Sequence, residues 1–337
     1  MKKIRFLTGA TLIAVGAVLV PTAAQAATPW PGPIINSSYR WDFDSLDAYG
    51  STDAADTYTS QLYETGLLKF TDGGTIVTSD DWCSDPIDAP GGVTTDGDDT
   101  IITCAPYVIP VGEPGAGLTA TVEIRILDSL NVARLFYTVE NTTGADIVVP
   151  DVYISVQWEY STYNGVSSSG VRGDGTNSML FGDQDTWIIT AESNAEMPSG
   201  VAWAAGCDTS FTVTGTDASD MAISTGEATT FAAGTSTYYA TFLQMQTPSA
   251  STDDAMNAAI NTLGESMTAR YSSLSPELSV GMPAGISVEF WQGACAPADP
   301  VLPNTGLNPG DAIALGVLGV MLIATGGIAF ARRRVRS

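Results

Sequence analysis

Alternating apolar and polar residues form the clearest pattern in the middle of the chain. In LTATVEIRIL (118–127) and ARLFYTVEN (133–141) every second residue is apolar. A period of two predicts half-buried β-strands, and the short gap between the two segments predicts that they pair antiparallel. Segments of the same kind predict further strands at 151–160, 185–191, 199–205, 210–215, 236–245 and 285–292.

A helical period appears once, in the segment 252–271. Its apolar residues recur three or four positions apart, and the polar residues STDD that precede them are suited to capping a helix. The expected apolar face consists of Ala255, Met256, Ala259, Ile260, Leu263 and Met267. Ser275-Pro276 predicts the start of one more helical turn. Short strands separated by turn residues, with a single helix, predict a mainly β, antiparallel β-sandwich-like domain.

The longest apolar run lies close to the C-terminus. Residues 312–331 are 20 consecutive uncharged and mostly apolar positions. As a helix they would extend about 30 Å, the thickness of the hydrocarbon core of a bilayer. The basic tail 332–337, with four arginines, follows at once. Because basic residues beside a span stay in the cytoplasm, this pattern predicts a transmembrane helix with the body of the protein outside.

The N-terminus predicts export as well. Lys2, Lys3 and Arg5 precede an apolar stretch from Leu7 to Val20, and Ala24-Gln25-Ala26 closes the segment. A basic start, a short apolar stretch and a small-residue ending are typical of a secretory signal peptide. We therefore expect residues 1–26 to be removed.

Between the body and the C-terminal span lies LPNTG, formed by Leu302, Pro303, Asn304, Thr305 and Gly306. Together with the span and the basic tail, this motif resembles the sorting signal of Gram-positive cell-wall-anchored proteins, Leu-Pro-any-Thr-Gly. The resemblance implies that a membrane sortase cuts between Thr305 and Gly306 and joins the threonine to peptidoglycan. The partners expected from it are sortase and peptidoglycan, and the expected location is the cell wall, with a precursor that passes through the membrane.

The charge balance and the absence of histidine exclude several functions. Cleavage at both ends would remove seven of the 13 basic residues and one of the 37 acidic ones, which leaves 36 acidic and six basic residues and a net charge of −30. Such a charge repels nucleic acid and favours cations or basic partners. The chain contains no histidine, so Ser-His-Asp and Cys-His catalysis and histidine metal sites are excluded.

Four cysteines, Cys83, Cys104, Cys207 and Cys295, lie in the exported part. An even number in an exported chain predicts disulfides, and four cysteines allow three pairings. We favour Cys83 with Cys104 and Cys207 with Cys295. No two of them have the spacing of zinc ligands, so we expect no metal site built on cysteine.

Two kinds of chemistry stay open for the acidic residues. Hydrolysis of a glycan needs only two carboxylates and aromatic platforms, but no spacing in the sequence singles out a carboxylate pair. The acidic turns at 94–100, 173–177 and 182–185 carry the oxygen ligands that calcium prefers, yet none has a complete loop motif, and turn formation explains them. We therefore expect no catalytic residue and no cofactor, with calcium as the one ion that the turns would suit.

The expected organisation follows from these segments. The signal peptide is followed by an extracellular β-rich domain at 27–295, either as one unit or with a sub-boundary near the Gly/Pro-rich residues 110–117. A spacer at 296–301 leads to the sorting motif. The expected function is that of a wall-anchored surface protein with a non-enzymatic structural or binding role, and the alternative is a histidine-free, carboxylate-based glycan hydrolase on the cell surface. The sequence does not indicate the extracellular ligand.

Overall fold

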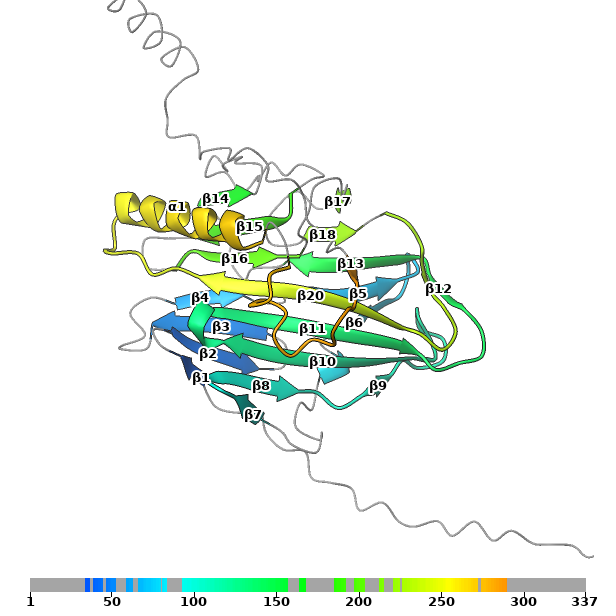
Figure 1. The fold of residues 1–337 in the computed structure, drawn as a ribbon. Helices are drawn as coiled ribbons and strands as arrows, with labels where there is room; N and C mark the ends of the chain where they lie inside the picture. Colours follow the sequence, from blue (N-terminus) through cyan, green and yellow to red (C-terminus); the bar gives the residue numbers. More distant parts are fainter. Residues whose placement is uncertain are drawn as a thin grey trace, which may run out of the picture.

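The computed structural model describes residues 34–36, 39–44, 47–52, 59–62, 66–79, 81–83, 93–156, 164–167, 185–191, 197–203, 212–214, 221–224, 226–271 and 274–289 (Figure 1). Within these ranges the chain is mainly β, in largely antiparallel sheets, with one long helix. The fold class expected from the alternating pattern is therefore confirmed. No helix in these ranges is long and apolar enough to cross a membrane.

A ten-stranded sheet forms the centre of the molecule. Its strands lie in the order β14 (Asn164–Ser167), β15 (Trp187–Ala191), β16 (Ser199–Ala202), β20 (Ser236–Met245), β11 (Val132–Asn141), β10 (Leu118–Leu127), β8 (Asp99–Thr103) and β7 (Val93–Asp96), with β9 (Tyr107–Val108) paired to β10 and β21 (Val288–Glu289) paired to β20. The β20–β21 pair is parallel, whereas the other pairs of this sheet that the structure describes are antiparallel.

Strands β10 and β11 are the neighbours that the sequence predicts. They pair over their whole length, from Leu118 opposite Asn141 to Leu127 opposite Val132. A short 3₁₀ turn at Asp128–Leu130 (η2) joins them, and Asn131 closes it with φ +52°. Asparagine adopts this left-handed conformation more easily than most residues because its side chain is short and polar.

Three smaller sheets complete the β structure. A five-stranded sheet has the order β17 (Thr212–Thr214), β18 (Met221–Ser224), β13 (Asp151–Val156), β5 (Leu67–Thr71) and β6 (Ile76–Thr78). A four-stranded sheet has the order β1 (Ile34–Asn36), β2 (Tyr39–Asp44), β3 (Asp47–Thr52) and β4 (Thr59–Leu62), and β12 (Ile147–Val149) pairs with β19 (Thr229–Phe231).

The first hydrophobic core lies between the central sheet and the five-stranded sheet. The alternation of β10 places Ile124 on this side, where it belongs to one buried cluster with Leu243 of β20 and with Leu68 and Ile154 of the smaller sheet. Trp41 of β2 belongs to the same cluster, so the N-terminal sheet shares this core. Two sheets that bury their facing apolar residues in one core form a β-sandwich.

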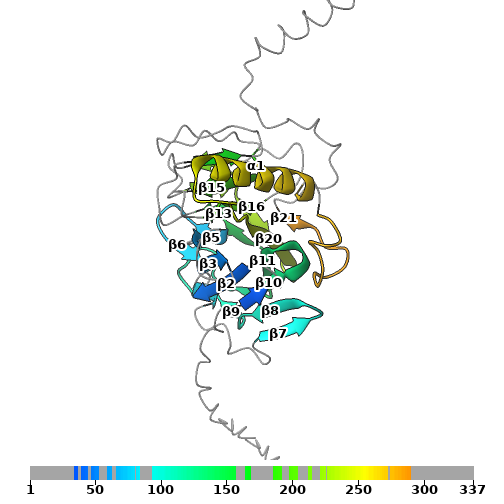
Figure 2. The same cartoon turned by 90° about the vertical axis from the view of Figure 1, so that its left-hand side faces the viewer.

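The second core lies on the opposite face of the central sheet. Helix α1 (Asp253–Arg270) buries Met256, Ile260, Leu263 and Met267 there, and the segment 274–289 contributes Leu278. Figure 2 shows β5 and β6 on the other side of the central strands from this segment. The side chain of Thr252 accepts a hydrogen bond from the N–H of Ala255 at 3.3 Å, so the expected cap is confirmed. Of the expected apolar face, Ala255 alone is half-buried and not buried.

Some boundaries differ from the expected ones. The strand expected at 285–292 is described only at Val288–Glu289, because Pro283 and a turn with Gly285 at φ +75° precede it; residues 290–292 lie outside the described ranges. Strand β13 ends at Val156, and 157–160 are not described. At Ser275-Pro276 the chain forms the single helical turn that was expected, closed by a hydrogen bond from Ser279 N–H to the Ser275 carbonyl at 3.1 Å, and the turn does not continue into a longer helix.

The Gly/Pro-rich residues 110–117 connect β9 to β10 within the central sheet. Their turn is tight: Gly115 has φ +81°, and a Cβ there would lie 2.9 Å from the Phe70 ring. Only glycine combines this backbone conformation with so close an approach.

Candidate functional site

Most residues singled out in the sequence lie outside the described ranges. These are the signal peptide, the sorting motif 302–306, the apolar run 312–331, Cys207, Cys295, and the acidic turns at 173–177 and 182–184. Asp185, which closes the last of these turns, is described and buried. The attachment signal and the second expected disulfide therefore stay predictions from the sequence.

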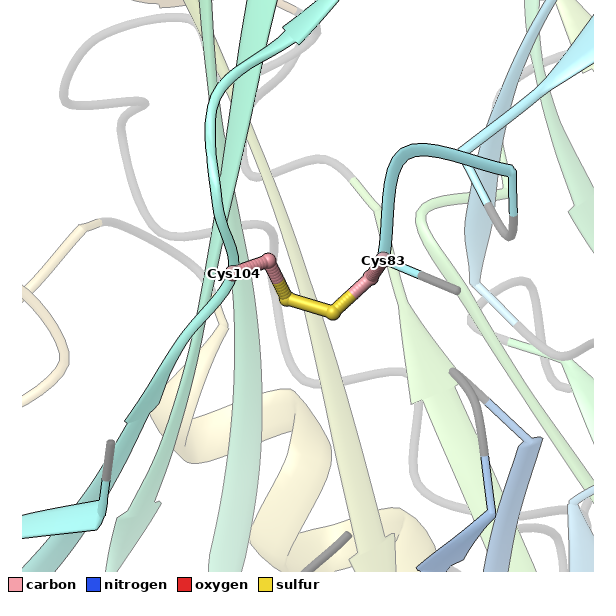
Figure 3. The surroundings of a disulfide bond; sticks show 2 residues. All are labelled: Cys83 and Cys104. Atoms are coloured by element: carbon pink, nitrogen blue, oxygen red, sulfur yellow. A yellow bond between two sulfur atoms is a disulfide. The ribbon is translucent and has the colours of Figure 1, made fainter. Parts of the chain in front are cut away.

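The expected disulfide between Cys83 and Cys104 is present (Figure 3). It joins the 3₁₀ turn Asp81–Cys83 (η1), which follows β6, to the residue directly after β8. Both cysteines are buried in the first core, so the bond connects the five-stranded sheet to the central sheet. A disulfide in this position keeps the segments that form the two sheets close together in the unfolded chain, which restricts the unfolded state and stabilises the fold.

The acidic turn at 94–100 is a β-hairpin, which agrees with the turn explanation given above. Strands β7 and β8 pair with Asp96 opposite Asp99, and Gly97 has φ +64° in the turn between them. Both carboxylates bind one side chain of β10: Arg125 donates from Nη2 to Asp96 Oδ2 at 2.6 Å and from Nε to Asp99 Oδ2 at 2.9 Å. Among the described residues no group of three Cys, Asp or Glu side chains is arranged to hold a metal ion.

A second arginine lies directly beside the first. Arg134 of β11 is the register partner of Arg125, on the face of the central sheet that carries the second core. Its side chain is completely buried, and Nη2 donates to Glu123 Oε1 at 2.8 Å. Its guanidinium carbon lies 5.7 Å from the centre of the Phe136 ring. These five charged residues, Asp96, Asp99, Glu123, Arg125 and Arg134, form a charge cluster on β7, β8, β10 and β11.

The segment 274–289, here called the strap, covers this charge cluster. In Figure 1 the strap crosses in front of β20 and β11. Arg134 Nη1 donates to the carbonyl of Leu278 at 2.9 Å and to that of Val280 at 2.7 Å. Gly281 has φ +77°, and a Cβ at this position would overlap Nη1 of Arg125. The two arginines thus bind the carboxylates on one side and support the strap on the other.

Burial acts on the two arginines in different ways. For Arg134, burial lowers the pKa below its ordinary value, and the charge of Glu123 opposes this effect without cancelling it. For Arg125, burial also lowers the pKa, but the hydrogen bonds and charges of Asp96 and Asp99 outweigh it, so the net pKa is raised. Both side chains keep their charge at neutral pH because an arginine starts from a very high pKa.

Beside the strap, the same face of the central sheet is more open. The register places Thr121, Thr138 and Tyr238 in one row across β10, β11 and β20. All three are half-buried, whereas Glu140, further along β11, is exposed. The ring of Tyr238 stacks on Phe136, with centroids 5.8 Å apart and planes 7° apart. This surface combines hydroxyl groups, a carboxylate and one aromatic ring that is partly accessible.

The chemistry of the charge cluster favours a structural role. Its three carboxylates bind two buried guanidinium groups, so removing a carboxylate would leave a buried charge without its partner. A glycoside hydrolase needs one carboxyl group that donates a proton and a second that acts as base or nucleophile. The carboxylates of this cluster are instead engaged by arginine. The arrangement holds backbone segments in place.

Sequence reasoning missed this cluster. The available signal was the scarcity of basic residues: Arg125 and Arg134 are two of the six that the mature chain would keep, and both lie in strongly apolar strands. The hairpin between the two strands was predicted, and counting outward from its turn places the arginines opposite each other. A rare charge inside a predicted strand core implies a buried partner.

Comparisons with known proteins show a distant structural likeness. No family model matches the chain, and no curated protein matches it. A galactose mutarotase-like protein from Lactobacillus casei is 11% identical with a TM-score of 0.37, over 63% of this chain and 99% of that one. A galactose mutarotase-related enzyme from Lactobacillus acidophilus is 9% identical with a TM-score of 0.38, over 66% and 98%. An α-galactosidase from Geobacillus stearothermophilus is 11% identical with a TM-score of 0.35, over 72% and 44%.

At identities and TM-scores this low, the likeness assigns the chain to none of these families. The mainly β architecture rests on the sheets and cores described above.

Proposed function

We propose that this chain is the precursor of a cell-wall-anchored surface protein whose extracellular domain has a non-catalytic binding or structural role. The observation that carries the proposal is the order of LPNTG, an apolar run of 20 residues and an arginine-rich tail at 302–337, behind a secretory signal at 1–26. Sortase would join Thr305 to peptidoglycan, and the protein would be a substrate in that reaction.

Two features of the described residues support the proposal of an exported domain with high stability. A disulfide between Cys83 and Cys104 suits an oxidising, extracellular environment. The carboxylates of the charge cluster neutralise buried arginines, which supports a role in stability over a role in proton transfer. The strongly negative charge of the mature chain keeps it soluble and repels anionic polymers.

Replacing Thr305 tests the attachment. The Thr305→Ala variant is expected in the membrane fraction or the medium, whereas the wild type is expected to require muramidase for release from the wall. Asn304→Ala is the matched control, because the third position of the sorting pattern accepts any residue; this variant is expected to stay in the wall. A Thr305→Ala protein that is still released only by muramidase, on wall fragments, would refute the attachment.

A glycan panel tests the non-catalytic role. The purified domain is expected to bind a member of the panel saturably, or none, without releasing reducing ends. Time-dependent release of reducing ends by the wild type would instead establish the glycan hydrolase that the sequence left open as an alternative.

A further inference from the structure

We propose that the strap (274–289) is a mechanical latch, in which buried Arg134 stops the C-terminal end of the domain from unravelling when the wall anchor is pulled. This inference rests on the proposed attachment through Thr305, because that bond makes the C-terminus the point where load enters the domain. It applies to the form in which Cys207 and Cys295 are not bonded to each other, since that disulfide would carry the load past the strap to Cys207. Four features of the described residues lead to it.

The first feature is the weak pairing of the last described strand. Strand β21 contacts β20 over only two register pairs, Tyr238 with Val288 and Tyr239 with Glu289. Force applied beyond residue 289 reaches this strand before any other described element. A strand with so few ladder hydrogen bonds separates easily, so β21 alone cannot hold the domain against a sustained pull.

The second feature is the hold that Arg134 has on the strap. Its Nη1 donates to two carbonyls of the strap, those of Leu278 and Val280, which lie eleven and nine residues before the end of β21. Charge-assisted hydrogen bonds are stronger than neutral ones, and water does not compete here because the side chain is fully buried. Leu278 itself is buried in the second core.

The third feature is that Arg134 is itself held in place by the central sheet. Arg134 is the third residue of β11, which pairs with β10 on one side and β20 on the other, and Glu123 of β10 binds its second terminal nitrogen. The planar guanidinium donates hydrogen bonds to the carboxylate of Glu123 and to both carbonyls at the same time, an arrangement that lysine cannot reproduce. The strap is thus attached to the most extensively paired strands of the central sheet.

The fourth feature is a second stop further back in the chain. The end of helix α1 is held by Arg270, which donates to the carbonyl of Leu130 at 3.1 Å and to Gln244 Oε1 at 2.9 Å. The hydroxyl of Tyr271 also donates to Gln244 Oε1, at 3.3 Å. If the strap is lost, unravelling is therefore expected to halt at Tyr271.

These two stops define the lengths that a pulling experiment would measure. Peeling β21 back to Val280 frees the nine residues 281–289, about 30 Å of chain at about 3.5 Å per residue. Peeling back to Tyr271 frees the eighteen residues 272–289, about 60 Å. The latch predicts that the wild type halts at the shorter length.

Single-molecule pulling tests the latch. The protein is residues 27–305, the form that both cleavages would leave, with Cys207 and Cys295 replaced by alanine so that no disulfide between them carries the load past the strap. This protein serves as the wild type of the assay and is held by a handle fused after Thr305 and a second handle at Thr142, an exposed residue directly after β11. The wild type is expected to show a first step of about 30 Å, whereas Arg134→Met is expected to show a first step of about 60 Å. Arg134→Lys, which keeps the charge beside Glu123, is expected to keep the 30 Å step but to release the strap beyond Val280 at a lower force than the wild type.

Arg270→Lys is the matched control, since it alters another arginine that donates to a backbone carbonyl but lies before the strap. Its first step is expected to match that of the wild type. The latch is refuted if Arg134→Met gives the wild-type first step, or if the wild type unfolds without an early step. A variant that fails to fold is recognised by its thermal melt, and Arg134→Lys then decides.

The pulling assay uses a fused handle and no sortase, so its outcome is independent of the wall attachment. Loss of the predicted steps would refute the latch and leave the Thr305 fractionation result unchanged. Loss of wall attachment would leave the steps in place but remove the load that gives them a role.

Discussion

Truncating Glu123 to alanine isolates the stability that the buried ion pair contributes. In the wild type Glu123 Oε1 lies 2.8 Å from Arg134 Nη2, with the arginine side chain fully buried and the glutamate side chain 26% exposed. The truncation leaves a buried guanidinium without its counter-charge. Removing one partner of a buried ion pair typically costs about 3–5 kcal/mol. Because water reaches Glu123 and replaces part of the lost interaction, we expect about 2–3 kcal/mol.

Urea and thermal unfolding measure this loss directly. For a domain of this size, a loss of 2–3 kcal/mol corresponds to a decrease in Tm of about 5–10 °C. Glu140→Ala is the matched control, since Glu140 lies on the same sheet face but is exposed, and its free energy of unfolding is expected to change by less than about 0.5 kcal/mol. Combining Glu123→Ala with Arg134→Met is expected to cost less than the sum of the two single changes, because no buried charge is then left unpaired. Equal effects of Glu123→Ala and Glu140→Ala would refute the reasoning.

Three further predictions concern other parts of the domain. Replacing Cys83 and Cys104 by alanine opens a loop with a sequence separation of 21 and is expected to lower the free energy of unfolding by about 3 kcal/mol, a loss that reducing agent should reproduce in a variant that lacks Cys207 and Cys295. Gly281→Ala is expected to cost about 1–3 kcal/mol in the same urea titration, because φ is +77° and the new Cβ overlaps Arg125; wild-type stability would contradict this. Burial raises the pKa of Tyr239 and of Tyr271, so the folded state favours the protonated phenols. Their contribution to stability should be constant below about pH 10, and the free energy of unfolding should fall as the pH rises above that value. Urea unfolding at a series of alkaline pH values checks this, and a free energy of unfolding that rises above about pH 10 would contradict it.

The elements that the sequence predicted well are long and strictly periodic. The pattern of β10 and β11 gave both strands, their pairing and the side of the sheet that each residue faces, because a period of two over ten residues fits no other structure. Helix α1 was equally clear, with a capping threonine and apolar residues three or four apart. In both cases local pattern and tertiary environment agree.

The strands that were not predicted are short or lack alternation. Strands β1 to β4 have three to six residues each and include polar sequences such as TSQL and DAYGST. Their pairing depends on neighbours from other parts of the fold, which a single segment does not reveal. The strand expected at the C-terminal end was too long because Pro283 and Gly285 interrupt it before Val288.

The charge cluster shows where sequence reasoning ended. The acidic turn at 94–100 was interpreted as a turn, correctly, but its carboxylates could not be matched to Arg125 without the register of β8 against β10. The contact of Arg134 with Leu278 and Val280 spans more than 140 residues and follows from no local pattern. Long-range contacts of this kind are set by the folded topology.

The central claim, covalent attachment to the wall, is tested most directly by the mass of the C-terminal peptide. Protein released from cell walls by muramidase would be digested and its last peptide identified by mass spectrometry. Wall attachment through the sorting motif predicts a peptide that ends at Thr305 and carries a peptidoglycan fragment on the threonine carbonyl. A C-terminal peptide that continues through Gly306 into the apolar run at 312–331 would contradict the account.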